Sequence, residues 1–316
     1  MYKSFFHLTR SPFELTPDPT CFVPTARHNE ALASLYYGVR RHKGFVVVTG
    51  EVGTGKTLLL RCLLRLLEES KDVAYAYLFN SRLTPNEFLQ YTLQDFGLPA
   101  AGKNKAEMLF ELSRFLISRG SSGQTTVLVV DEAHLLSPDL LEEIRLLSNL
   151  ETFNDKLLQI VLVGQPELDI MLDSMDLRQL KQRITLRAHL TALTEEETVH
   201  YIEQRMQIAA AGSGQKSPFT EQAVSFIYRF SGGLPRWINS ICENCLLTAY
   251  ARQTTTITPE IVATVAKELR VETSRFGESA SFVSTHLDAR QSSDSVLDFD
   301  STVERPAAGS RAQRLR

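Results

Sequence analysis

Five short apolar runs alternate with longer stretches of helical periodicity between residues 45 and 190. The apolar runs cover residues 45–50, 73–79, 126–132, 158–164 and 184–190. The helical stretches between them cover residues 56–69, 84–97, 105–119 and 137–150. Because runs that are apolar on both faces need cover on both sides, this alternation is typical of a parallel sheet between two layers of helices. The pattern predicts an α/β fold.

The pattern changes at about Thr194, where the apolar runs stop. Four helical stretches follow, and each opens with a Thr or Pro of the kind that starts helices. They cover residues 194–211, 220–230, 235–252 and 258–270. A small all-helical domain is therefore expected after the α/β domain.

Composition completes this division of the chain. Residues 1–43 combine a proline-bearing arm with one helical stretch, residues 44–192 hold the α/β domain and residues 193–271 the helical domain. Residues 272–316 are rich in Ser and Asp, and such a composition cannot bury enough apolar surface to offset the entropy of ordering. We expect a disordered polar tail there.

A glycine-rich sequence, GEVGTGKT, joins the first apolar run to a helical stretch at residues 50–57. It fits the G-x-x-x-x-G-K-[ST] pattern (Walker A) in the strand-to-helix setting that this pattern requires. The glycines let successive backbone N–H groups point inward at a phosphate, and the start of the helix adds positive potential. Lys56 is expected to reach the β- and γ-phosphates, and the Thr57 hydroxyl to bind Mg²⁺. The predicted nucleotide-binding residues are Gly50, Glu51, Val52, Gly53, Thr54, Gly55, Lys56, Thr57 and Leu58.

Two acidic residues, Asp131 and Glu132, close the apolar run at 126–132. Burial of carboxylates is unfavourable unless they bind a partner, so a metal and a phosphate nearby would explain the pair (Walker B). Asp131 is placed to bind the Mg²⁺ shell through water, and Glu132 to polarise the water that attacks the γ-phosphate. The alternative interpretation is a pair of carboxylates that cap a helix. Together with the glycine-rich sequence, the pair predicts hydrolysis of ATP with Mg²⁺ as cofactor.

Two further residues have positions that suit phosphate sensing. Gln165 follows the run at 158–164, where it could contact the γ-phosphate or the attacking water, and a plain loop glutamine is the alternative. Arg236 follows a Gly-Gly-Leu-Pro turn, from which its guanidinium could swing over the γ-phosphate. The alternative for Arg236 is that it caps a helix or packs against Trp237.

A basic segment precedes the last apolar run. Arg183 stands just before that run, where an arginine could project onto the nucleotide of a neighbouring subunit. Arg178 and Lys181 lie in the same segment, so the choice among the three residues stays open. A solvated basic face is the alternative to any role in a shared site.

The N-terminal arm carries the aromatic residues Phe5, Phe6, Phe13 and Phe22 among prolines that stiffen it. We expect these aromatic side chains to pack on the α/β domain near the adenine end of the site. Contact with adenine and plain packing are left as equal alternatives.

Charge and hydropathy narrow the class of protein. The net charge of the 316 residues is −3, so the surface as a whole does not attract polyanions. Binding of nucleic acid is therefore not favoured. No apolar run reaches the roughly 18 residues of a membrane helix. The 4 cysteines do not form a secreted disulfide framework in a chain of this size. We expect a cytoplasmic protein.

Several of these motifs together resemble AAA+ ATPases, which are P-loop NTPases of the ASCE type. More narrowly, the chain resembles secretion ATPases of the general-secretion-pathway A (ExeA) type from about Tyr2 to about Arg270. The likeness rests on the segments FFHLTRSPFELTPDPTCFVPT, GEVGTGKT, VVDEAHLL, VGQPEL, LRQLKQRI and GGLPRWIN. It implies a sheet of strand order 5-1-4-3-2 followed by a helical lid.

The resemblance also implies a biological setting. Relatives act as homo-oligomers, in rings or partial rings, and use ATP to drive assembly of cell-envelope export systems in general secretion, pilus biogenesis or exosortase-linked exopolysaccharide export. Full-length secretion members continue into a transmembrane helix and a peptidoglycan-binding domain, whereas this sequence ends in a polar tail. The short exopolysaccharide- and exosortase-associated ATPases are therefore the expected match, located in the cytoplasm or peripherally at the inner membrane. The alternative function is that of a regulator on DNA, like the transposition-helper ATPases that share this core.

Overall fold

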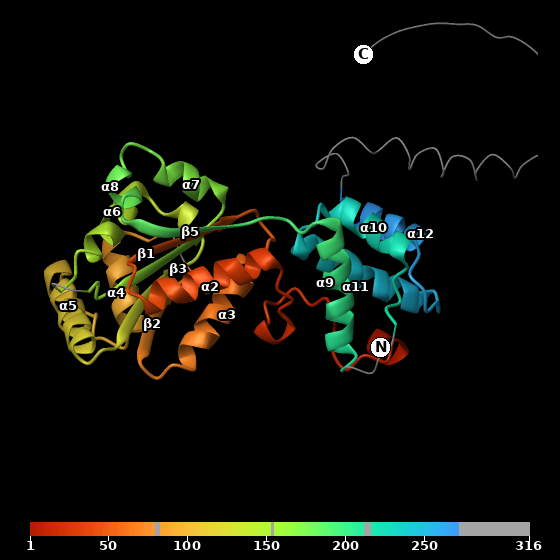
Figure 1. Cartoon of the computed structure of the whole chain (residues 1–316), viewed down its shortest axis with the longest axis horizontal. Coiled ribbons are helices and arrows are strands. Elements are labelled where there is room, and N and C mark those ends of the chain that lie inside the picture. Colours follow the sequence, from red (N-terminus) through yellow and green to blue (C-terminus); the bar gives the residue numbers. More distant parts are fainter. Residues whose placement is uncertain (80–82, 153–154, 212–215, 272–316) are drawn as a thin grey trace, which may run out of the picture. The chain divides into compact units, whose positions relative to one another are not determined.

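A five-stranded parallel sheet forms the centre of the α/β part of the chain in the computed structural model, which describes residues 1–79, 83–152, 155–211 and 216–271 (Figure 1). The tail that the sequence predicts to be disordered, residues 272–316, lies outside the described residues. The sheet has the order β2-β3-β4-β1-β5, and every neighbouring pair is parallel. The strands are β1 (Phe45–Gly50), β2 (Val73–Leu78), β3 (Thr125–Val130), β4 (Gln159–Gly164) and β5 (Ile184–Leu190). This result confirms the α/β fold and the strand order 5-1-4-3-2.

The burial of the strands follows their place in the sheet. All residues of β1, β3 and β4 are buried, whereas most residues of the edge strands β2 and β5 are partly or fully exposed. Successive residues of a strand point to opposite faces, so Val46 and Val48 of β1 join one apolar cluster while Phe45 and Val47 join another. Strands that are buried on both faces carry mostly apolar side chains, which is why these three appear in the sequence as apolar runs. Their buried polar residues are Thr49, Thr125, Thr126 and Gln159.

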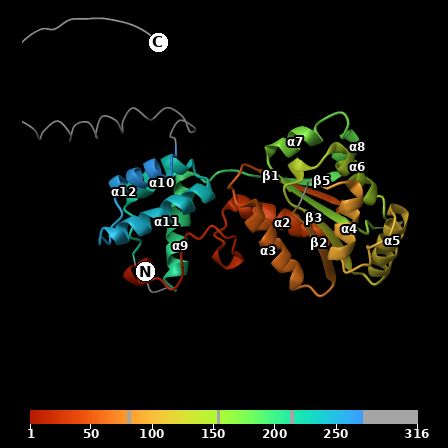
Figure 2. The same cartoon turned by 180° about the vertical axis from the view of Figure 1, so that it is seen from behind.

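Helices cover both faces of the sheet, as Figures 1 and 2 show from opposite sides. Helices α2 (Ala26–Arg40) and α3 (Lys56–Glu68) pack on the Val46 side. Five helices pack on the other side. These are α4 (Pro85–Asp95), α5 (Lys105–Ser121), α6 (Pro138–Leu147), α7 (Pro166–Leu172) and α8 (Arg178–Lys181).

Local sequence explains where several of these helices begin. Thr84 and Asn104 each accept a hydrogen bond from a backbone N–H three residues on, and the glutamate at that position bonds back to the cap, which satisfies two otherwise unpaired donors. Thr194 forms the same capping box at the start of α9 (Glu195–Ala209). The helices α7 and α8 were not predicted, because 7 and 4 residues are too few to establish a helical period.

The helices after β5 form a bundle with a hydrophobic core of their own. It consists of α9, α10 (Glu221–Ser231), α11 (Pro235–Ala251) and α12 (Pro259–Glu268), in agreement with the four predicted stretches. Within the described residues the chain also has three short pieces: α1 (Tyr2–Phe5), and the 3₁₀ turns η1 (Pro19–Cys21) and η2 (Ala133–Leu135).

The N-terminal arm packs differently from the expectation. Phe6 and Phe13 are buried in the core of the helical bundle and Phe5 packs against it, whereas Phe22 alone joins the cluster between α2, α3 and the sheet. The prediction that all four aromatic side chains pack on the α/β domain is therefore wrong for three of them. The physical reason is the apolar face that the bundle presents, which the arm covers.

A buried arginine fixes the arm in this place. The guanidinium of Arg205 on α9 donates hydrogen bonds to the carbonyl oxygens of Pro12 (2.6 Å) and Cys21 (3.1 Å). It also lies over the ring of Tyr201. A buried charge is tolerated only when its donors are satisfied, so the arm supplies acceptors that α9 itself cannot.

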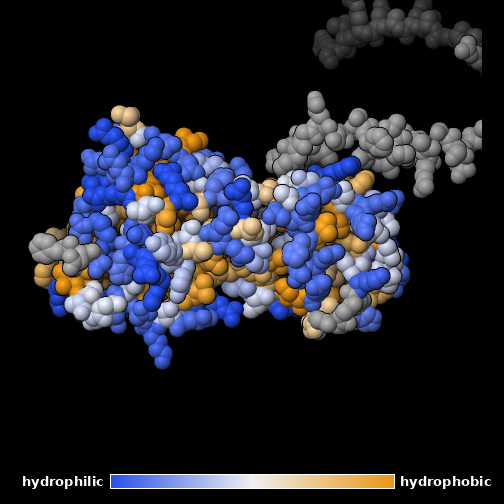
Figure 3. Space-filling view, in the orientation of Figure 1, coloured by the Kyte–Doolittle hydropathy of each residue, from blue (hydrophilic) through white to orange (hydrophobic). Residues whose placement is uncertain are grey.

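The surface shown in Figure 3 is mainly hydrophilic, with apolar side chains in small separate groups. This distribution is typical of a face exposed to water. Among the helices of the described residues, none combines the length and the hydropathy needed to span a bilayer.

Candidate nucleotide-binding site

The loop between β1 and α3 is shaped to hold an anion. Gly53 and Gly55 have φ angles of +89° and +98°, in the left-handed region where a side chain would be strained. The amides of Val52, Gly53 and Gly55 donate to no acceptor among the residues that the structure describes. Free donors that precede the first turn of a helix are the features of a phosphate site.

Lys56 points back into this loop. The residue is only 7% exposed, and its Nζ donates hydrogen bonds to the carbonyl oxygens of Gly50 (2.7 Å) and Glu51 (3.0 Å). Burial lowers the pKa of Lys56, and the nearby carboxylates of Glu132 and Asp131 oppose that shift. A phosphate in the loop would give this ammonium a charged acceptor in place of two neutral ones.

Asp131 lies directly after β3, 5% exposed, and both of its carboxylate oxygens accept hydrogen bonds. Oδ2 accepts from the hydroxyls of Thr57 (3.3 Å) and Tyr77 (3.0 Å), and Oδ1 accepts from the amide of Glu132 (2.9 Å). Burial, together with Asp131 itself, raises the pKa of Tyr77, so its hydroxyl is a donor at neutral pH.

These oxygens fit the predicted Mg²⁺. A hydroxyl and a carboxylate are hard donors that lie side by side at the edge of the phosphate loop. In the described part of the chain no three His, Cys, Asp or Glu side chains gather as a metal cage. Mg²⁺ commonly takes one or two protein oxygens and completes its shell with water and substrate phosphates, so the residues present suit it.

Glu132 has a backbone conformation that is rare for its residue type. Its φ is +52°, a left-handed conformation that persists in non-glycine residues where the surroundings fix it, often at functional sites. Its side chain is 40% exposed, and Oε2 lies 3.5 Å from Nδ1 of His134. The carboxylate of Glu132 is therefore reachable by water, as its predicted role requires.

Gln165 is the N-cap residue of α7, directly after β4. Its backbone N–H donates to Nδ1 of His134 at 3.4 Å. His134 thus lies between Gln165 and Glu132. The structure brings Lys56, Thr57, Asp131, Glu132 and Gln165 to the carboxyl ends of the neighbouring strands β1, β3 and β4, the edge at which parallel sheets bind ligands.

Arg236 touches the loop through its backbone. The N–H of Arg236, near the start of α11, donates to the carbonyl oxygen of Gly53 at 3.2 Å. A Cβ added at Gly53 would lie 2.9 Å from Cβ of Arg236, so only glycine fits there. The guanidinium is exposed and has no hydrogen bond or ion pair to any described residue. It is free to meet a phosphate.

The basic segment before β5 contains one free charge. Arg183 donates to the carbonyl oxygen of Arg145 (3.1 Å) and to Oγ of Ser148 (2.5 Å), so its guanidinium is bound to α6 and the turn after it. Lys181 forms an ion pair with Asp173. Arg178 is exposed and, within the described ranges, its guanidinium has neither a hydrogen bond nor an ion pair.

Both arginines of this segment line a cavity of about 430 Å³ beside α6. Because Arg183 is occupied within its own chain, Arg178 is the arginine of this segment whose guanidinium is available for another contact. A single sequence could not make this distinction, since it depends on where α6 lies.

A further residue, His28 on α2, was missed by the sequence analysis. It is 5% exposed, its Nε2 lies 3.0 Å from the carbonyl oxygen of Thr54, and its Nδ1 lies 2.8 Å from Oγ1 of Thr25. A carbonyl only accepts, so Nε2 carries the proton, and a neutral ring accepts from Thr25 at Nδ1. The neutral ring therefore holds the phosphate loop through one backbone carbonyl. No motif at residues 25–28 signals this contact.

Acid is expected to weaken the fold through His28. Burial lowers the pKa of His28 below its ordinary 6.5, so the folded state binds its proton less readily than the unfolded state. The contribution of this residue to stability is present above about pH 6.5 and is lost as the pH falls through the lower folded-state pKa. The free energy of unfolding, measured with urea at pH 7 and at pH 5, should therefore fall less between these two pH values in His28→Gln than in the wild type.

A second variant separates the effect of protonating His28 from the effect of losing its hydrogen bond to Thr54. His28→Gln keeps a donor for Thr54, whereas His28→Ala leaves that buried carbonyl unpaired and should cost about 1–3 kcal/mol at pH 7. Equal acid sensitivity of the wild type and His28→Gln would show that other groups govern the pH dependence.

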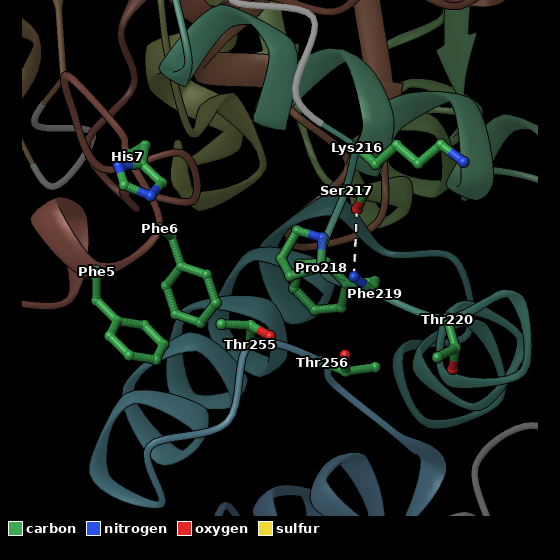
Figure 4. Close-up of a pocket in the computed structure, with 10 residues that line it drawn as sticks. All are labelled: Phe5, Phe6, His7, Lys216, Ser217, Pro218, Phe219, Thr220, Thr255 and Thr256. Atoms are coloured by element: carbon green, nitrogen blue, oxygen red, sulfur yellow. Dashed lines mark hydrogen bonds between the residues drawn. The ribbon is translucent and has the colours of Figure 1, made fainter.

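A second cavity, of about 260 Å³, lies between the N-terminal arm and the helical bundle (Figure 4). Phe5 and Phe6 line it from the arm, and Thr255 and Thr256 line it from the turn before α12. Phe5 and Phe6 are residues for which adenine contact was one alternative, but the described lining contains no residue of the phosphate loop and neither Asp131 nor Glu132. The nucleotide is therefore not expected there.

Comparison with known proteins agrees with this geometry. The family described as "AAA domain" matches residues 39–172. The chain is 45% identical over 254 residues to general secretion pathway protein A of Aeromonas hydrophila. The aligned region covers 80% of this chain and 45% of that protein. The chain thus spans less than half the length of this relative.

Solved structures share the fold at low identity. Cdc6p from Pyrobaculum aerophilum has a TM-score of 0.65 and 21% identity over 86% of this chain and 73% of that one. The Holliday junction branch migration motor RuvB of Thermotoga maritima has a TM-score of 0.52 and 18% identity over 84% of this chain and 76% of that one. Residues 39–172 therefore match the AAA domain family, the fold is that of AAA+ proteins, and 80% of the chain resembles general secretion pathway protein A.

Proposed function

We propose that this protein binds ATP with Mg²⁺ at residues 50–58 and hydrolyses it, and that the cycle drives assembly of a cell-envelope export system. The observation that carries the proposal is the convergence of free loop amides, Lys56, Thr57 and Asp131 at one edge of the sheet. Bound Mg²⁺ would neutralise charge that develops on the transferred phosphate.

The residues of the chain divide the work of hydrolysis in this proposal. Amides of the loop and Lys56 hold the phosphates, while Thr57 and Asp131 hold the metal and its water. Glu132 accepts the proton of the attacking water. A general base of this kind typically raises the rate of an enzyme by about 10²–10⁴-fold. Gln165 orients the same water or contacts the γ-phosphate.

We further propose that residues 193–271 act as a lid on the AAA+ domain, residues 44–192, with residues 1–43 as an arm. The backbone contact between Arg236 and Gly53 supports this, because it couples the start of α11 to the phosphate loop. A guanidinium that meets the γ-phosphate would make the position of the lid depend on the nucleotide.

The export role rests on the relative named for the general secretion pathway. Action as a homo-oligomer, a place in the cytoplasm or at the inner membrane, and a specific link to pili or exosortase-linked exopolysaccharide export belong to the proposal. Steady-state ATP hydrolysis with and without duplex DNA at physiological salt tests it against the DNA-regulator alternative. Hydrolysis that needs DNA, with a gel shift, would favour that alternative.

A shared active site predicts a division of labour between Arg178 and Arg183. Arg178→Ala should lower ATP hydrolysis about 100-fold, the scale of losing one group that stabilises charge in a transition state. Arg183→Ala should instead lower stability by about 1–3 kcal/mol, because Arg145 and Ser148 lose a partly buried donor. Hydrolysis rates and urea unfolding of both variants check this.

Mixing variants tests whether the site is shared. Arg178→Ala subunits mixed with Glu132→Gln subunits should regain hydrolysis, since each supplies the residue that the other lacks. Lys181→Ala, which removes a charge from the same short helix, is the control and should keep the wild-type rate. A mixture as inactive as its parts would argue against a contact in trans.

A further inference from the structure

We infer that Tyr77 is a positioning residue for the Mg²⁺ site: its hydroxyl fixes the carboxylate of Asp131 in the orientation that binds the metal shell. The inference rests on the proposed function, because it concerns the same site. Tyr77 is not part of the glycine-rich sequence that follows β1 or of the acidic pair that follows β3, because it lies on β2.

The place of Tyr77 follows from the register of the sheet. Tyr77 on the edge strand β2 pairs with Val129 on β3, and Asp131 lies two residues beyond Val129. Tyr77 belongs to the cluster between the sheet and α3, the helix that begins at the phosphate loop. Its ring is packed there, so the hydroxyl reaches Asp131 at 3.0 Å with little freedom to move.

The hydrogen bonds of Asp131 give Tyr77 its importance. Oδ2 accepts from Thr57 and Tyr77, while Oδ1 accepts from the amide of Glu132. The Thr57 hydroxyl would hold Mg²⁺ through a lone pair of its oxygen and could still donate its proton to Oδ2. Tyr77 and the amide are donors that would not ligate the metal, so they would hold the carboxylate, one on each oxygen, and one lone pair of Oδ1 would stay free for metal-bound water.

The same strand offers a matched control. Tyr75 lies two residues earlier on the same face of β2 and in the same cluster, and its hydroxyl donates to Glu68 near the end of α3. Tyr75→Phe and Tyr77→Phe therefore remove the same group, from similar surroundings and with a carboxylate partner in both cases. They differ in whether that carboxylate belongs to the nucleotide site.

The test measures metal binding separately from hydrolysis. A fluorescent, non-hydrolysable ATP analogue is titrated into each protein at increasing Mg²⁺, and Mn²⁺ bound to each nucleotide complex is counted by electron paramagnetic resonance. Tyr77→Phe should need about 10-fold more metal for half-maximal binding, the lower end of the effect of partners that orient metal ligands. Tyr75→Phe should match the wild type, and in EDTA all three should bind the analogue equally.

Four outcomes would overturn the inference or its basis. Equal metal requirements of Tyr77→Phe and the wild type would show that Asp131 needs no help from β2. Equal shifts in both Phe variants, or a lowered melting temperature that accounts for the shift, would reduce Tyr77 to a packing residue. A wild type that binds no nucleotide would instead overturn the proposed function itself.

Discussion

Lys56→Ala is expected to lose nucleotide binding, with the affinity for ATP falling about 10³-fold. Nζ already lies inside the loop, held by the carbonyl oxygens of Gly50 and Glu51, while the side chain of Arg236 passes close to Gly53. Removing one member of a desolvated charge pair costs about 2–5 kcal/mol, and about 1.4 kcal/mol is a factor of ten. The loop amides alone would then face the charge of the triphosphate.

Titration of a fluorescent ATP analogue measures this loss. Lys71→Ala is the matched control, because it removes the same charge from the exposed turn between α3 and β2, at the opposite edge of the sheet. Far-ultraviolet circular dichroism should show both variants folded, since the two hydrogen bonds of the Lys56 side chain go to carbonyl oxygens of the loop. An unchanged affinity in Lys56→Ala would mean that the nucleotide binds elsewhere.

Glu132→Gln is expected to bind ATP normally and to hydrolyse it about 10³-fold more slowly. The amide has the shape of the carboxylate but cannot take a proton from water, and loss of a general base lowers rates by about 10²–10⁴-fold. The left-handed backbone at residue 132 is held by a hydrogen bond from its N–H to Oδ1 of Asp131, and the substitution leaves this hydrogen bond in place. The variant should therefore accumulate in the ATP-bound, assembled state.

Single-turnover hydrolysis and size-exclusion chromatography with ATP check the rate and the assembly. Glu69→Gln, an exposed carboxylate at the end of α3, is the control for loss of one negative charge. Hydrolysis at the wild-type rate in Glu132→Gln would show that another group orients the water.

The sheet and the phosphate loop could be predicted because local sequence determines them. The runs that became β1, β3 and β4 are buried throughout and mostly apolar, and GEVGTGKT contains the glycines that its backbone angles require. The residues of such a loop are adjacent along the chain, so one sequence is enough to find Lys56 and Thr57.

The remaining parts of the site depend on contacts between distant elements. The choice between Arg178 and Arg183 is decided by Ser148 and the carbonyl of Arg145, more than 30 residues earlier in the chain. His28 and Tyr77 lie in ordinary helix and strand patterns, and only the packed fold brings them to Thr54 and Asp131. No periodicity or spacing in the sequence encodes such pairs.

The arm was misplaced for a related reason. Its aromatic residues signalled burial, but two apolar surfaces were available to receive them. The acceptors that Pro12 and Cys21 offer to the buried Arg205 decide in favour of the helical bundle. A lone arginine within a predicted helix gives no sign of that requirement.

A crystal structure of Glu132→Gln with ATP and Mg²⁺ tests the central claim most directly. We predict the β-phosphate within hydrogen-bonding distance of the amides that follow Gly53, Nζ of Lys56 turned from the loop carbonyls to the phosphates, and Mg²⁺ on the Thr57 hydroxyl with Asp131 bound to its water. A nucleotide bound outside the loop, or an ion remote from Asp131, would contradict the account.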